Sequence, residues 1–149
     1  MIILLDLNGT IATDGRIKEG VKERLAILKE RAEIYILSAD TFGTLEDISK
    51  HLNVKGLKVE KEKYGSEKLA KLKILEEIKK QNSNKKIIAI GNGNNDELLL
   101  KNADLGICVI GDEGAYSKTI INSDIVVKDI KDALDLIIKE NRLKATIRD

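Results

Sequence analysis

The sequence predicts an α/β fold, a three-layer αβα sandwich around a mostly parallel sheet. Three observations support this prediction. Short apolar runs alternate along the chain with segments whose apolar residues recur every 3.6 positions, as in βαβ units. The composition, 42% hydrophobic and 34% charged, is that of a globular protein. The length of 149 residues fits a single domain spanning residues 1–149.

Six apolar runs are predicted to be strands because they are short, rich in Ile, Leu and Val, and bounded by polar residues. They are Ile2–Leu7, Glu33–Ser38, Leu57–Glu60, Lys86–Ile90, Leu105–Ile110 and Asp124–Lys128. In addition, Asp14-Gly15 lies between Ile11-Ala12 and Ile17, which predicts a short hairpin turn.

Helices are predicted between these strands, where apolar residues keep the spacing of one helical face. Such segments run from Val21 through Leu28, from Leu69 through Ile78 and from Ile130 through Ile138. The segment after about Lys139 is expected either to continue the last helix or to fray. Alternating strands and helices favour right-handed crossovers between parallel strands.

The bulk composition excludes several function classes. The formal net charge of +1 gives no electrostatic case for binding nucleic acid or a membrane surface. No apolar stretch reaches the ~20 residues of a membrane span, and no signal peptide is predicted. Cys108 is the sole cysteine, so an intrachain disulfide is excluded, and we interpret it as a core residue. A soluble cytoplasmic protein is expected.

Four clusters of polar residues follow predicted strands or lie on a helix that could reach them. They are Asp6-Leu7-Asn8-Gly9-Thr10, Ser38-Ala39-Asp40, the pair Lys68 and Lys71, and Gly91-Asn92-Gly93-Asn94-Asn95-Asp96. If the first, second and fourth predicted strands are parallel neighbours, their carboxyl ends bring these clusters to one edge of the sheet, where ligands of such folds bind. Asp112 and Glu113 also follow a strand and border this edge, but we interpret them as loop acids.

These residue types suit phosphate chemistry. Asp6 could be a covalent nucleophile, a metal ligand or both. Hydroxyl and amide groups can hold phosphoryl oxygens, a lysine can neutralise developing charge, and carboxylate and amide oxygens are the ligands that Mg²⁺ prefers. Together they meet the needs of Mg²⁺-assisted phosphoryl transfer.

The order of these motifs resembles the haloacid dehalogenase (HAD) superfamily, and most closely the phosphorylation domain of P-type ATPases. Those domains carry Asp-Lys-Thr-Gly-Thr, a Thr-Gly-Asp turn and Gly-Asp-Gly-x-Asn-Asp, which Asp6 to Thr10, Ser38 to Asp40 and Gly91 to Asp96 match in order. The chain is similar to the small soluble P-type ATPase-like proteins. This resemblance, which covers the chain to about Ile138, implies a HAD-like core.

The resemblance implies a role for each matching residue. Asp6 would accept the phosphoryl group, with Asn8 and Lys71 as the other catalytic residues; we prefer Lys71 to Lys68 from its helical spacing to Leu75 and Ile78. The implied phosphate-binding residues are Leu7, Asn8, Ser38, Ala39, Lys71 and Asn95. The implied ligands of a Mg²⁺ cofactor are Asp6, Asn8, Asn92 and Asp96, with Asp96 acting through a bound water.

Two residues depart from the pattern of hydrolytic members. Asn8 stands where many have an Asp that serves as acid and base, and an amide cannot titrate, which typically costs about 10²–10⁴-fold in rate. Asn92 replaces a metal-binding Asp and removes one negative charge from the cation site. We therefore expect weak or slow turnover.

The predicted function is a Mg²⁺-dependent phosphatase or phosphotransferase with an aspartyl-phosphate intermediate on Asp6. The alternative is a degenerate, non-catalytic phosphate-binding or protein-interaction module. The expected partner is a phosphorylated substrate, either a small molecule or a macromolecule. The intervals between the motifs leave no room for a cap domain, and an uncapped site suggests a macromolecular substrate or a homo-oligomer whose neighbouring subunit covers the site. No nucleic-acid or membrane partner is expected.

Overall fold

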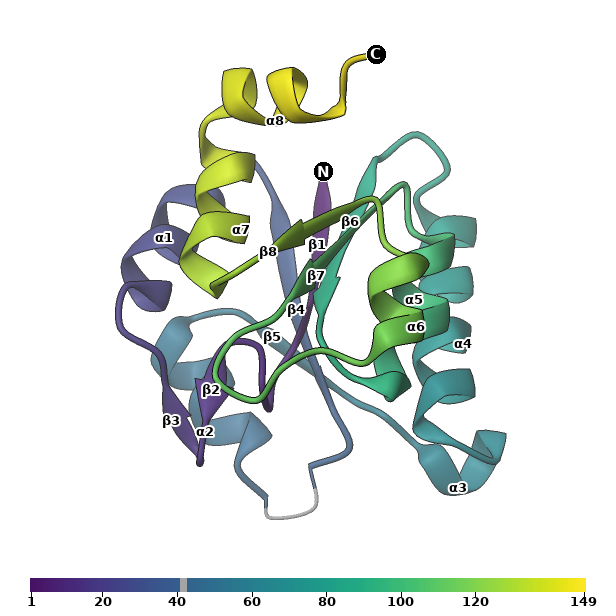
Figure 1. Ribbon diagram of the computed structural model, residues 1–149. Helices are drawn as coiled ribbons and strands as arrows, with labels where there is room; N and C mark the ends of the chain where they lie inside the picture. The colour runs from purple at the N-terminus through teal and green to yellow at the C-terminus, as the bar shows by residue number, and fades with distance from the viewer. Residues whose placement is uncertain (41–42) are drawn as a thin grey trace.

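The computed structural model, which describes residues 1–40 and 43–149, contains a six-stranded parallel sheet with the strand order β5-β4-β1-β6-β7-β8 (Figure 1). Its strands are β1 (Ile2–Asp6), β4 (Glu33–Ser38), β5 (Lys55–Lys58), β6 (Ile87–Gly91), β7 (Leu105–Val109) and β8 (Ile125–Val127). Every pairing between neighbouring strands of this sheet is parallel. The predicted three-layer αβα architecture is confirmed.

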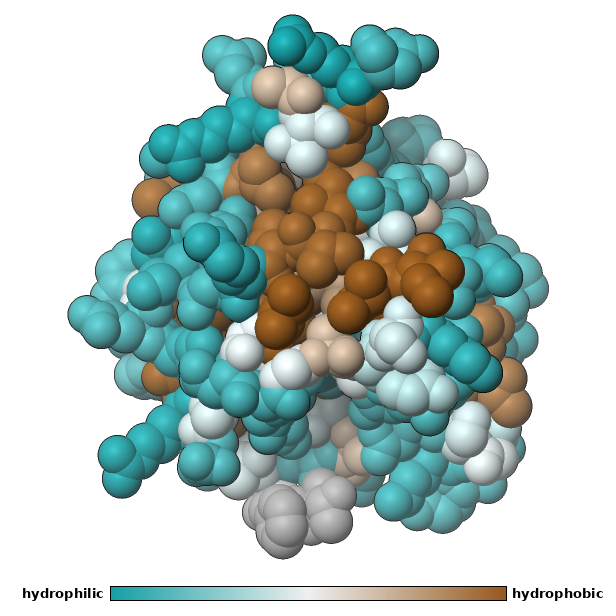
Figure 2. Space-filling model, viewed as in Figure 1, coloured by the Kyte–Doolittle hydropathy of each residue, from teal (hydrophilic) through white to brown (hydrophobic). Residues whose placement is uncertain are grey.

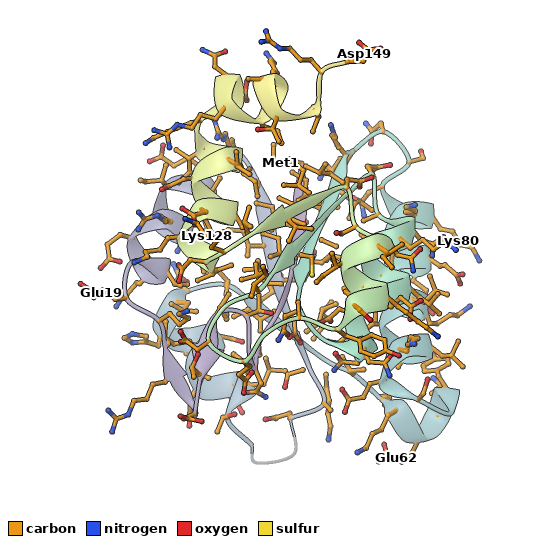
Figure 3. All side chains as sticks on the ribbon, in the orientation of Figure 1. Met1, Glu19, Glu62, Lys80, Lys128 and Asp149 are labelled. Atoms are coloured by element: carbon orange, nitrogen blue, oxygen red, sulfur yellow. The ribbon has the colours of Figure 1, made fainter. Side chains whose placement is uncertain are left out.

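Helices cover both faces of the sheet (Figure 1). One face carries α1 (Val21–Leu28), α2 (Leu45–Leu52) and α7 (Ile130–Ile138), followed by α8 (Glu140–Ile147). The other face carries α3 (Lys61–Tyr64), α4 (Glu67–Gln81), the short 3-10 helix η1 (Asn94–Asp96), α5 (Glu97–Asn102) and α6 (Ser117–Ile121). Figure 3 shows side chains filling the space between these helices and the sheet.

The central strand β1 is buried along its whole length because its side chains enter both cores. Ile3 and Leu5 pack on the side of α1 and α7, whereas Ile2 and Leu4 pack on the side of α4 and α5. Successive side chains of a strand point to opposite faces, so a strand covered on both faces must be apolar at every position. This requirement explains the continuous Ile-Ile-Leu-Leu run.

The predicted hairpin is present. β2 (Ala12–Thr13) and β3 (Arg16–Ile17) pair antiparallel around Asp14-Gly15. Both turn residues have positive φ, 51° and 76°, as a tight two-residue turn requires. The hairpin lies at the end of the molecule to which the carboxyl end of β1 points (Figure 1).

Five of the six predicted strands agree with the structure to within one residue, whereas the sixth strand and the segment after Lys139 differ further. The edge strand β5 spans Lys55–Lys58, two residues earlier than predicted, because its register is set by pairing with β4, where Tyr35 lies opposite Lys55. The segment after Lys139 neither continues the preceding helix nor frays. The backbone leaves helical geometry at Lys139, with φ −101° and ψ 78°, and then forms the separate helix α8.

Apolar side chains also gather on one outer face, over β7, β8 and α6 (Figure 2). The exposed members there are Ile110, Tyr116, Ile121 and Val126. None of them lines the cavity described below. In the described part of the chain, no helix has the length and apolar character needed to cross a bilayer.

Candidate functional site

The carboxyl ends of β4, β1 and β6 lie side by side, as the strand order requires. The chain runs outward from β1 to β4 and β5, and then returns to place β6 on the other side of β1. Such a reversal of strand order opens a crevice at the carboxyl edge of the sheet. A cavity of about 520 Å³ lies at this edge.

Most of the residues that the sequence predicts for the site line this cavity. Among them are Asp6, Asn8, Ser38, Ala39, Lys71 and Asn95. The other three lie behind this surface. Leu7 is a buried core residue, so only its backbone could face a ligand, whereas Asn92 and Asp96 are buried polar residues that are not part of the lining.

Lys71 joins two buried carboxylates. Its Nζ donates to Oδ1 of Asp6 at 2.7 Å and to Oδ1 of Asp96 at 2.6 Å. All three side chains are nearly inaccessible to solvent, with exposed fractions of 1%, 8% and 0% for Lys71, Asp6 and Asp96. The alternative lysine, Lys68, instead pairs with Glu97 at 2.8 Å and does not contact Asp6. Of the two candidates, the structure brings Lys71 to Asp6.

The local charges shift the pKa values of this pair. Burial raises the pKa of Asp6 to about 7; the nearby carboxylate of Asp96 adds to the rise, and hydrogen bonds from Lys71 and Thr10 oppose it. Burial disfavours the charged form of Lys71, but Asp6 and Asp96 outweigh this effect and raise its pKa. Lys71 is therefore a permanent cation beside a carboxyl group that titrates near neutrality.

Asp96 also organises the loop that follows β6. Its Oδ2 accepts hydrogen bonds from the backbone N–H groups of Asn92 at 3.0 Å and Gly93 at 3.1 Å. Gly91 makes room for this carboxylate, because a Cβ atom at that position would lie 2.5 Å from Cγ of Asp96. The backbone N–H groups of the Gly-rich loop therefore hold Asp96 in position beside Lys71.

Thr10 connects the first motif to the fourth. Its hydroxyl lies 3.1 Å from Oδ2 of Asp6 and 3.3 Å from Oδ1 of Asn92, and its single proton can be donated to one of them at a time. The Asn92 amide also donates to the Gly114 carbonyl at 3.2 Å. Sequence reasoning did not include Thr10 among the site residues, although it belongs to the Asp6 motif.

The oxygens around Thr10 are of the kind that Mg²⁺ binds, since a carboxylate and an amide carbonyl are both hard donors. Asp96 is less available as a direct ligand, because Lys71 and two backbone N–H groups already occupy its oxygens. Within residues 1–40 and 43–149, no group of three or more His, Cys, Asp or Glu side chains is arranged to hold a metal ion. The donor set fits a Mg²⁺ ion held by mixed carboxylate, amide and backbone oxygens.

The turn after β4 also lines the cavity and provides hydrogen-bonding groups there. Ser38 Oγ accepts a hydrogen bond from the Asp40 backbone N–H at 3.0 Å, and Asp40 Oδ1 accepts from the N–H of Leu45, the first residue of α2, at 2.9 Å. Asp40 adopts a positive φ of 51°, which its short polar side chain tolerates. The Ser38 hydroxyl, which lines the cavity, also has a proton that it can donate to a ligand.

Four acidic residues that were not predicted as site residues also line the cavity, namely Asp14, Asp40, Glu67 and Glu113. Glu113 comes from the loop after β7, and its position after a strand was the only sequence signal for it. Glu67, at the start of α4, accepts a hydrogen bond from Asn95 Nδ2 at 2.6 Å. Their arrival at one cavity depends on the tertiary fold.

Known structures resemble this fold over nearly its whole length. The 3-deoxy-D-manno-octulosonate 8-phosphate phosphatase of Moraxella catarrhalis, whose structure includes a magnesium ion, a phosphate ion and KDO, matches with a TM-score of 0.72 at 18% identity. That match covers 99% of this chain and 92% of the phosphatase. At this identity the likeness shows the fold alone.

Two further structures share more of the sequence. The catalytic domain of the CPx-ATPase CopB-B is 30% identical with a TM-score of 0.65; the match covers 82% of this chain but only 46% of that one. A phospho-aspartyl intermediate analogue of phosphoserine phosphatase is 25% identical with a TM-score of 0.62, over 80% of this chain and 63% of that one.

The fold and the clustered residues therefore define a protein with the architecture of HAD-type hydrolases. No protein-family model matches the chain. At the level of close relatives, it belongs to one family with the uncharacterized protein MJ0073 of Methanocaldococcus jannaschii, with 84% identity over 93 residues, which is 62% of this chain and all of that protein. The uncharacterized protein MJ0072 of the same organism is 95% identical over 41 residues, 28% of this chain and 93% of that protein.

Proposed function

We propose that this protein is a Mg²⁺-dependent phosphatase or phosphotransferase that forms an aspartyl phosphate on Asp6. The contact between Asp6 and Lys71 at the floor of the cavity carries this proposal, because it sets a carboxylate nucleophile beside a buried cation. The match to a phospho-aspartyl intermediate analogue of phosphoserine phosphatase supports the same chemistry.

In the first step, a carboxylate oxygen of Asp6 attacks the phosphorus atom, a P–O bond to Asp6 forms and the ester P–O bond breaks. Lys71 offsets the negative charge that Asp6 and the phosphoryl group bring together. The Ser38 hydroxyl and neighbouring backbone N–H groups hold phosphoryl oxygens. A Mg²⁺ ion held by Asp6, Asn92 and the Asn8 backbone carbonyl would neutralise phosphoryl charge.

In the second step, a water molecule or another acceptor attacks the phosphorus atom of the aspartyl phosphate and releases the Asp6 carboxylate. The attacking water must lose a proton, and the leaving alcohol of the first step must gain one. Asn8 lines the cavity where HAD hydrolases use an acid for these transfers, and an amide can do neither. We therefore propose weak turnover, limited by proton transfer.

The test uses Mg²⁺ with an aryl phosphate and with acetyl phosphate as donors, and measures released phosphate and hydroxylamine-sensitive labelling of the protein. Wild type is expected to show both, and Asp6→Asn neither. Asp112→Asn is the matched control, because this exposed acid pairs with Lys18 and does not line the cavity. An absence of Asp6-dependent release and labelling with both donors would contradict the proposal and favour a phosphate-binding module.

A further inference from the structure

The charged side chains that line the proposed phosphate cavity are mainly acidic. Besides Asp6, its lining contains the carboxylates of Asp14, Asp40, Glu67 and Glu113. In the described chain, Lys71 is the single cation of the lining, and it is already held between Asp6 and Asp96. A cavity that receives a phosphate ester would ordinarily be expected to carry the opposite balance of charge.

Two of these carboxylates have structural partners. Asp40 accepts a hydrogen bond from the Leu45 N–H, and Glu67 accepts one from Asn95. These contacts position the turn after β4 and the loop after β6. They do not cancel charge, because an N–H donor leaves the carboxylate ionised.

The other two carboxylates, Asp14 and Glu113, are exposed on the rim and have no ion-pair partner among the described residues. Glu113 reaches toward the Asp6 loop: its Oε2 lies 2.1 Å from the point where a Cβ on Gly9 would stand. Lys18, which contacts the loop acid Asp112, is also paired with Asp129. Lys18 is therefore already paired with two other acids and does not neutralise the charges of Asp14 and Glu113.

An acidic rim of this kind would favour some phosphate esters over others according to the charge on the alcohol part of the ester. When the phosphoryl group lies at Asp6, the remainder of the ester extends toward the rim. A second anionic group there is repelled by Asp14 and Glu113, whereas a cation is attracted. Within the part of the cavity that the structure describes, no lysine or arginine other than Lys71 is available to bind the further phosphates of a polyphosphate chain.

We infer that the preferred substrate is a phosphate monoester whose other end carries a protonated amine, and that Asp14 and Glu113 select it. This inference rests on the proposed function, since it assumes that phosphorus lies at Asp6. It narrows the substrate class to amine-bearing monoesters and disfavours nucleotides and carboxylated sugar or acid phosphates.

The test compares three small monoesters of similar size: O-phosphoethanolamine, n-propyl phosphate and phosphoglycolate, whose far ends are cationic, neutral and anionic. We expect kcat/KM to fall in that order, with the amine favoured about ten-fold over the propyl ester, as two partly exposed charge contacts allow. The Asp14→Asn, Glu113→Gln double variant should bring this ratio close to one. Raising the salt concentration should also reduce it.

The control is the Glu23→Gln, Asp47→Asn double variant, which removes two exposed acids that do not line the cavity and should keep the wild-type ratio. Equal kcat/KM for the three esters, with turnover that still depends on Asp6, would overturn this inference and leave the proposed function standing. A ratio that survives in the Asp14, Glu113 variant would overturn it as well. Failure of wild type to turn over any of these esters or acetyl phosphate would overturn both.

Discussion

The Nζ atom of Lys71 lies 2.7 Å from Oδ1 of Asp6, although the two residues are 65 positions apart in the chain. Because Asp96 lies 2.6 Å from the same Nζ, one buried lysine balances two buried carboxylates. Removing that lysine leaves both acids without a cation, although both side chains are largely buried. The contact therefore matters for stability as well as for the proposed chemistry.

Lys71→Met should lower the free energy of unfolding by about 3–5 kcal/mol at pH 8, the usual cost of leaving a buried charge unpaired. The loss should be smaller at pH 5, where Asp6 is protonated and one of the two charges disappears. Asp6-dependent phosphoryl transfer should fall by about 10²-fold or more. Urea unfolding at both pH values and a phosphate-release assay measure these effects.

Lys68→Met is the matched control. It removes the charge of a neighbouring lysine on the same helix, but the side chains of Lys68 and of its partner Glu97 are both partly exposed. We expect a change within about 1 kcal/mol. A loss equal to that of Lys71→Met would show that the effect belongs to helix α4 in general and not to the buried contact.

The pH dependence of Asp6 labelling follows from its pKa of about 7. A carboxyl group attacks phosphorus only when it is deprotonated, so the rate of labelling should rise with pH. Because the Mg²⁺ ion proposed to bind Asp6 would lower the pKa of this carboxyl group, we expect the half-maximal rate at or below pH 7. Single-turnover labelling with acetyl phosphate between pH 5 and pH 9 tests this expectation. A rate that falls with rising pH, or a half-maximal rate above pH 7, would contradict it.

The same shift predicts how Asp6 affects stability. Because the pKa of Asp6 is raised from 3.8 to about 7 on folding, the folded state binds the extra proton between these values. Its stabilising contribution is complete below about pH 4 and is lost as the pH rises through 7. Asp6→Asn should therefore unfold with a smaller decrease in stability from pH 4 to pH 8 than wild type. Denaturant titrations at several pH values measure the two slopes.

Asn8→Asp should accelerate hydrolysis of the aspartyl phosphate, by up to about 10²–10⁴-fold, because it introduces a group that can transfer protons beside Asp6. The measurement is the decay of labelled protein after removal of the donor. Asn84→Asp is the control, since this exposed residue precedes β6 at the opposite edge of the sheet. An unchanged decay would place the limitation elsewhere, and Asn92→Asp, which restores a charged metal ligand, would be the next variant to measure.

Gly106→Ala should destabilise the fold by about 1–3 kcal/mol, the cost of overpacking a core. A Cβ at this position in β7 would lie 2.3 Å from the backbone oxygen of Leu100, which cannot rotate away. Gly56→Ala is a matched comparison, because the atoms nearest to its Cβ would belong to the side chains of Ser49 and Leu45 and not to the backbone. We expect a smaller loss there, measured by thermal unfolding of both variants.

Much of the fold could be predicted because it rests on local patterns. The Ile-Ile-Leu-Leu run, the helical spacing that includes Leu75 and Ile78 and the Asp14-Gly15 turn reflect local requirements of backbone geometry and burial, although Leu69 of the same helix is exposed. The edge strand β5 was misplaced by two residues. Its exposed residues Lys55 and Lys58 leave no apolar pattern, and only pairing with β4 sets its limits.

The chemical types of the site residues were also encoded in the sequence, in Asp6, Asn8, Ser38 and the Gly-rich loop. What these residues contact was not encoded locally. Lys68 and Lys71 lie on neighbouring turns of one helix, and only the packing of α4 against the sheet points Lys71 at Asp6 and leaves Lys68 with Glu97. The sequence by itself thus determined which groups are available and that they follow strands of one sheet. The tertiary structure alone decided which charges meet, because ion pairs and the acidic rim join residues brought together by strand order and helix packing.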